Sequence, residues 1–88
     1  MARPGCTLEV RCAATRPGDR VACVGGDALL GGWAVHEALE MTTTASSFPS
    51  WTAQVPALPA GTEFKLVVRR RDGSVRWEPV SGNRRWPA

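Results

Sequence analysis

A hairpin pattern near the C-terminal end constrains the fold of this chain more than any other feature. Residues 63–70 form the clearest strand pattern in the sequence, and residues 74–78 form a second, shorter one. Between them lies Asp72-Gly73, a dipeptide that favours the turn of an antiparallel hairpin. The segment therefore predicts two neighbouring strands, and it points towards an all-β chain.

Four further strand patterns extend this interpretation along the chain. They cover residues 7–13, 21–24, 38–43 and 51–55, and turn-forming residues separate them. The longest stretch with any helical periodicity, residues 29–41, is interrupted by Gly31-Gly32 and Trp33. Six or seven short strands with turns every ten or so residues are typical of a β-sandwich or barrel.

The length and the apolar patterning set the organisation of the chain. Its 88 residues suffice for one domain, and we expect residues 1–5 as an N-terminal tail and residues 6–88 as a single module. The apolar stretches are too short to span a bilayer, so no membrane partner is expected. No apolar run follows Arg3, so no secretory signal is expected either.

Three cysteines, Cys6, Cys12 and Cys23, give an odd count without a C-x-x-C pair. A disulfide framework or a structural zinc site requires more than this, so no metal and no cofactor are predicted. Cys6 and Cys12 share one strand parity with Leu8 and Val10, which favours small buried thiols. Reduced thiols lean towards an intracellular compartment such as the cytosol or a plastid.

The residues that catalysis requires are missing or ordinary. His36 is the only histidine, and a lone histidine in a turn region is usually solvated. No nucleophile elbow, phosphate-binding loop or dinucleotide fingerprint occurs. The carboxylates lie beside polar or turn residues, and the chain is short for a glycosidase scaffold. We therefore expect no catalytic residues and no enzyme activity.

Tryptophan is over-represented, with four residues (Trp33, Trp51, Trp77 and Trp86) against two phenylalanines and no tyrosine. A thin core of this size does not need four indole rings. An exposed indole is a flat apolar platform with one polar N–H, and it matches the apolar face of a pyranose ring. Nucleic-acid bases stack on the same kind of platform. However, acidic residues are interspersed with the basic ones, and the run Arg69-Arg70-Arg71 lies beside a turn, so no nucleic-acid partner is expected.

An ordered set of short motifs resembles the family 20 carbohydrate-binding modules, which are starch-binding domains. The set comprises Val24-Gly25, Leu30-Gly31-Gly32-Trp33, Trp51, Leu58-Pro59-Ala60-Gly61, Glu63-Phe64-Lys65, Arg76-Trp77-Glu78 and Asn83-Arg84. The resemblance covers nearly the whole chain. It implies an immunoglobulin-like antiparallel sandwich without catalytic activity, which binds starch, glycogen or maltooligosaccharides and targets a covalently linked domain or partner to them.

The resemblance also implies a binding site. The two platform tryptophans fall on Trp33 and Trp77, and the residues that bond sugar hydroxyls fall on Lys65 and Asn83. Glu78 neighbours this site, and Trp51 matches the tryptophan of a second site in the family. Because the tyrosines of that second site have no counterpart here, core packing is favoured for Trp51. Ordinary structural roles remain open for the others: a loop anchor for Trp33, core for Trp77, a surface position for Lys65 and a turn for Asn83.

The turn at Asp72-Gly73 decides on which face Trp77 lies. A strict two-residue turn would pair Trp77 with Val68 and place its ring on the face of Phe64, opposite to Lys65. A longer loop or a bulge returns Lys65 and Trp77 to one face. We therefore predict the longer loop.

Two alternative functions remain open. Family members continue past the Asn-Arg motif into a closing strand, so a missing strand would leave an open sheet edge, which invites pairing with another chain. The first alternative is accordingly a protein-interaction sandwich with a degenerate sugar site. The second is a single-stranded nucleic-acid binder that uses the tryptophans with residues 69–71, and steep salt dependence would identify it.

Overall fold

The computed structural model describes residues 5–55, 58–78 and 82–86, with the backbone only at Cys6. The elements in these residues are β1 Cys6–Arg11, β2 Arg20–Gly25, the 3-10 turns η1 Ala28–Leu30 and η2 Val35–Glu37, β3 Leu39–Glu40, β4 Ser50–Val55, β5 Glu63–Arg69, β6 Val75–Trp77 and β7 Arg84–Arg85. The predicted all-β class and the predicted six or seven strands are confirmed. Of the expected tail only Gly5 belongs to the described residues, and the described part contains no helix that could cross a membrane.

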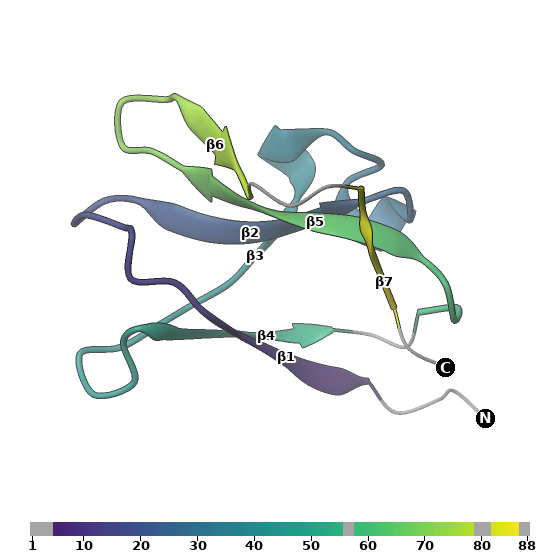
Figure 1. Ribbon diagram of the computed structural model, residues 1–88, viewed down its shortest axis with the longest axis horizontal. Helices are drawn as coiled ribbons and strands as arrows, with labels where there is room; N and C mark the ends of the chain where they lie inside the picture. Colours follow the sequence, from purple (N-terminus) through teal and green to yellow (C-terminus); the bar gives the residue numbers. More distant parts are fainter. Residues whose placement is uncertain (1–4, 56–57, 79–81, 87–88) are drawn as a thin grey trace.

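Two antiparallel sheets form a sandwich, seen as an upper and a lower layer in Figure 1. β1 pairs with β4 in the smaller sheet. The larger sheet has the order β3-β2-β5-β6, and β7 pairs with the same edge of β5 further along that strand. A bridge between Thr42 and Thr52 links the chain after β3 to β4 on one side of the sandwich. On the other side β1 lies across a groove from β6 and β7 without pairing to them, and we call this open side the seam.

The core lies between the two sheets and fixes which way β5 faces. Phe64, Leu66 and Val68 pack inward against residues of β1 and β4. Because successive strand residues point to opposite faces, Lys65 and Val67 face outward on the far side of the larger sheet. This outer face of β5 is where the predicted site begins.

β2 is buried on both faces, which explains the uninterrupted apolar run at residues 21–24. Its outward residues Ala22 and Val24 form a small cluster with Val67, and Val35 and Ala38 pack against that cluster. The stretch 29–41 is thus not a long helix but two short 3-10 turns that lie against the larger sheet. The strand expected at residues 38–43 is reduced to Leu39–Glu40.

Candidate functional site

The loop between η1 and η2 holds Trp33 in an unusual backbone conformation. Asp27 caps η1 by accepting from the Leu29 N–H at 2.9 Å, and the chain then takes positive φ values at Gly31, Gly32 and Trp33 (87°, 57° and 67°). Among the described residues Trp33 is the only non-glycine with a positive φ. Such a conformation costs about 1–2 kcal/mol for an L-residue and is often found at functional sites.

Two contacts fix the position of Trp33 at the end of β2. Its backbone N–H donates to the Gly25 carbonyl at 2.8 Å. A Cβ on Gly26 would lie 3.2 Å from the indole Nε1, so the ring passes close over this glycine. Trp33 remains 38% exposed, whereas Leu30 in the same loop is fully buried and anchors it. The loop therefore presents an indole at the surface.

The β5–β6 hairpin has the longer loop that the sequence analysis predicted. Val67 pairs with Trp77 and Val68 with Arg76, and the ladder closes where the Arg70 N–H donates to the Ser74 carbonyl at 2.7 Å. Three residues, 71–73, form the loop, and Gly73 adopts the positive φ of 91° that such loops require. Paired residues share a face of the sheet, so Trp77 faces outward with Val67 and is 42% exposed.

The four predicted site residues belong to neighbouring segments of the larger sheet. Trp77 and Lys65 are diagonal neighbours on the outer face, within reach for side chains of this length. Lys65 pairs with Val24, the residue before Gly25 that anchors the Trp33 backbone. Asn83 is exposed and precedes Arg84, which pairs with Phe64 next to Lys65. The topology thus places Lys65, Trp77 and Asn83 on adjoining segments of the larger sheet, whereas Trp33 lies in the loop after β2, in a hollow with Glu63 and Arg85.

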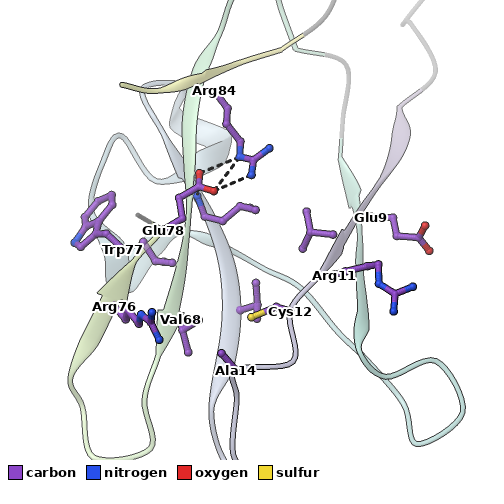
Figure 2. A pocket seen from close by; sticks show the side chains of 13 residues that line it. Glu9, Arg11, Cys12, Ala14, Val68, Arg76, Trp77, Glu78 and Arg84 are labelled. Carbon is purple, nitrogen blue, oxygen red and sulfur yellow. Dashed lines mark hydrogen bonds and ion pairs between the residues drawn. The ribbon is translucent and has the colours of Figure 1, made fainter. Parts of the chain in front are cut away.

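Glu78 is bonded within the protein rather than presented to solvent. Its Oε1 accepts from the Leu66 backbone N–H at 3.0 Å, and both its oxygens accept from the Arg84 Nε at 3.0 Å. The Glu78 side chain is only 11% exposed, and its carboxylate raises the pKa of Arg84 through this bond. Figure 2 shows the Glu78 carboxylate facing the Arg84 guanidinium, with the bonds between them dashed. The carboxylate ties together the segments that carry Trp77 and Asn83, and sequence reasoning missed this role of Arg84.

With this geometry established, the chain can be compared with known proteins. A family profile described as a starch-binding domain matches residues 5–88. The chain belongs to the starch-binding domain family. The family consists of non-catalytic carbohydrate-binding modules, so the predictions of the family and of a non-enzyme are confirmed.

Curated relatives and solved structures agree with this assignment. The module is 35% identical over 94 residues to a glucan 1,4-alpha-maltotetraohydrolase of Stutzerimonas stutzeri, covering 97% of this chain and 17% of that protein. It is 43% identical over 68 residues to a glucoamylase of Neurospora crassa, covering 73% of this chain and 11% of that protein. The family 20 module of a maltotetraose-forming amylase from Pseudomonas saccharophila superposes with a TM-score of 0.73 at 33% identity. The superposition covers 93% of this chain and 87% of that module. The module thus spans under a fifth of these curated relatives.

The other two tryptophans belong to the core. Trp51 is 7% exposed and donates its indole N–H to the Cys12 carbonyl at 3.1 Å, as the core interpretation predicted. Trp86 is 9% exposed and meets Phe64 edge-on with ring centroids 5.6 Å apart. One edge of Trp51 reaches a shallow groove that also contains Pro17 and the exposed Phe48. The sequence analysis assigned no role to Phe48.

Internal ion pairs occupy much of the arginine run. Arg69 bonds Glu40 at 2.8 Å, and Arg70 bonds Asp19 at 2.8 Å. The backbone N–H of Arg16, and then the Arg70 side chain, lower the pKa of Asp19 to about 2. These contacts make residues 69–71 a brace for the hairpin rather than a free basic patch.

The cysteines and the single histidine are the remaining residues with side chains capable of reactive chemistry. Burial raises the pKa of Cys23 to about 12, so its thiol stays protonated and inert. The expectation of buried cysteines is confirmed for Cys23, whereas Cys12 is a free thiol that is only partly buried. The side chain of Cys6 lies outside the described residues. His36 is exposed in η2. Within the described residues no cluster of histidine, cysteine and carboxylate side chains could hold a metal ion.

Proposed function

We propose that this module binds α-1,4-linked glucan of the starch or glycogen type by stacking sugar rings on Trp33 and Trp77. The exposure of these two indoles, 38% and 42%, carries the proposal, because the other tryptophans of the same chain are buried. Exposed apolar surface that polar residues surround often marks a ligand-binding site. A curved glucan chain offers apolar sugar faces to both rings.

Lys65 and Asn83 supply the polar half of the proposed site. Lys65 lies on β5, between β2 and the strand β6 that carries Trp77, and Asn83 immediately precedes β7, which pairs with β5 next to Lys65. Their amine and amide groups are of the kind that bond sugar hydroxyls. We assign Glu78 a positioning role, because its oxygens accept bonds from Leu66 and Arg84. The polar groups would fix the orientation of a glucan that the rings attract.

The expected affinity is modest. Two stacking platforms at about 1–3 kcal/mol each, with a few hydrogen bonds near 1 kcal/mol net, give about 5–8 kcal/mol in total. This corresponds to dissociation constants from micromolar to sub-millimolar. Such affinity suits a module that tethers a linked catalytic domain or partner to a polymer with many repeated sites. The names of the relatives, a maltotetraohydrolase and a glucoamylase, support this targeting role.

Calorimetric titration with β-cyclodextrin tests the proposal, because its signal does not depend on the tryptophans that the variant removes. We expect saturable binding by the wild-type chain, loss of binding in a folded Trp33→Ala, Trp77→Ala variant, and no loss in Leu29→Ala. Leu29 is a matched control because it is 53% exposed in the same loop region. Binding should change little as salt is raised, whereas a nucleic-acid site would weaken steeply. A folded wild-type chain that does not bind would overturn the proposal.

A further inference from the structure

A shallow hollow of about 420 Å³ lies beside Trp33. Three segments line it: the loop after β2 that carries Trp33, the chain that enters β5 at Glu63, and β7 with Arg85. The site residues that the family resemblance implies include Trp33 but neither Glu63 nor Arg85. Two charged residues therefore share a hollow with a proposed sugar platform and have no assigned role in binding.

Backbone hydrogen bonds hold the three walls of the hollow together. The Gly26 N–H donates to the Glu63 carbonyl at 3.2 Å, which fixes the loop after β2 against the start of β5. The Trp86 N–H donates to the Thr62 carbonyl and the Gly61 N–H donates to the Trp86 carbonyl, both at 2.8 Å. These two bonds fix the end of β7 at the same place. The hollow is thus formed before any ligand binds, as small-molecule sites usually are.

Strand alternation directs Arg85 and Glu63 to the outer face. Arg84 lines the groove at the seam, where its side chain bonds Glu78. Because successive residues of a strand point to opposite faces, Arg85 points away from the seam. Arg85 pairs with Glu63, and paired residues share a face. Glu63 also shares the outer face of β5 with Lys65, so one row of polar side chains leads from Lys65 to the hollow.

The two charged side chains form an ion pair that remains open to solvent. The Arg85 Nη2 lies 3.2 Å from the Glu63 Oε1, and the side chains are 70% and 44% exposed. An ion pair this exposed contributes little to stability. Its guanidinium nevertheless presents N–H donors and its carboxylate presents acceptors at the surface, and neighbouring sugar hydroxyls can both donate and accept. The pair is therefore chemically suited to bond a sugar ring beside it.

We infer that Arg85 and Glu63 bond hydroxyl groups of the sugar ring that stacks on Trp33, an assignment that rests on the proposed function. The indole supplies the apolar contact to this ring, and the ion pair supplies polar contacts to its rim. Asp27 also lines the hollow, which therefore carries two carboxylates and one guanidinium. This charge disfavours a phosphate or sulfate group and favours a neutral ligand rich in hydroxyl groups.

Calorimetric titration of the full chain with β-cyclodextrin tests the assignment through a double-mutant cycle. Arg85→Met keeps an aliphatic stem but removes the donors, so it should weaken binding about fivefold to tenfold. In a Trp33→Ala background, where the ring is no longer held, the same substitution should cost less than about twofold, whereas in a Trp77→Ala background it should keep its full effect. Arg20→Met is the matched control and should bind like the wild type, because Arg20 is 63% exposed and bonds Glu40 at 2.9 Å.

Two results would overturn the role of the ion pair. One is an Arg85→Met variant that binds like the wild type, and the other is an equal loss in both tryptophan backgrounds, which would mean that Arg85 acts through the position of β7. Thermal unfolding of each variant separates lost binding from lost folding. Glu63→Gln removes the charge of the other partner and should show the same dependence on Trp33, so it provides a second test if Arg85→Met unfolds.

The wild-type titration distinguishes this inference from the proposed function. A folded wild-type chain that does not bind overturns both. A wild-type chain that binds, with a Trp33→Ala variant that binds weakly and an unaffected Arg85→Met variant, overturns only the role of the ion pair.

Discussion

The four tryptophans divide into two pairs that the fold treats in opposite ways. Trp51 and Trp86 are 7% and 9% exposed, while Trp33 and Trp77 are 38% and 42% exposed. The buried pair lies between the sheets, where Trp51 donates its indole N–H to a carbonyl and Trp86 packs edge-on against Phe64. The exposed pair lies on or beside the outer face of the larger sheet, on a strained loop and on a hairpin strand. Composition alone could not separate the pairs, because strand parity and loop geometry decide the environment of each ring.

Substitution of Trp51 or Trp86 has the largest expected effect on the free energy of unfolding, and it tests the difference between the two pairs most directly. Trp86→Ala or Trp51→Ala should lower the free energy of unfolding by about 3–5 kcal/mol, because each leaves a cavity in a thin core. Trp77→Ala, in contrast, should cost less than about 1 kcal/mol. Urea unfolding followed by circular dichroism measures both. Equal destabilisation by Trp77→Ala and Trp86→Ala would remove the distinction between core and surface tryptophans.

The strained backbone of Trp33 gives the second prediction. Trp33→Ala and Trp33→Gly both remove the ring, so both should weaken β-cyclodextrin binding by about fivefold to a hundredfold. Only glycine relaxes the positive φ of 67°, so Trp33→Gly should be more stable than Trp33→Ala by about 1 kcal/mol. Calorimetric titration and urea unfolding give the two readouts. If the two variants were equally stable, the loop would not be strained at this position.

Most of the fold, and the face of the sheet on which Trp77 lies, could be predicted before the structure was known. The bonds between segments that are distant in the sequence could not. The Asp72-Gly73 pattern alone favours a two-residue turn, and it was the family resemblance, which requires Lys65 and Trp77 on one face, that predicted the longer hairpin loop and an outward Trp77. The Glu78–Arg84 bond could not be predicted, because it depends on β6 and β7 sharing one edge of β5. The positive φ of Trp33 likewise depends on its bond to Gly25 across the loop. Local pattern predicted the strands, and non-local pairing set the details of the site.

Glu78 provides the third prediction, which tests how Trp77 and Asn83 are held in place. Glu78→Gln should lower stability by about 1 kcal/mol, because the amide keeps one acceptor for Leu66 but loses the charge that binds Arg84. Glucan affinity should fall a few-fold with it as the two segments loosen. Arg84→Met removes the same bond and should reproduce both losses. If Glu78→Gln weakened binding and Arg84→Met did not, Glu78 would contact the glucan itself.

Asp19 gives the smallest expected effect, at the opposite end of the hairpin that carries Trp77. Its carboxylate accepts from the Arg71 backbone N–H at 3.0 Å and from the Arg70 side chain at 2.8 Å, so it braces the loop of residues 71–73. The folded protein lowers its pKa from the ordinary value of 3.8 to about 2. A lowered pKa means that the carboxylate stabilises the fold at pH values above 3.8 and that this contribution is lost as the pH falls through about 2.

Asp19→Asn should therefore reduce the melting temperature slightly at neutral pH. It should also flatten the decline of the melting temperature between pH 3.8 and about 2. Melting curves at several pH values measure both. A variant with an unchanged pH profile would show that the Arg70–Asp19 bond does not brace the hairpin, and the exposure of Trp77 would then depend on the β5–β6 ladder alone.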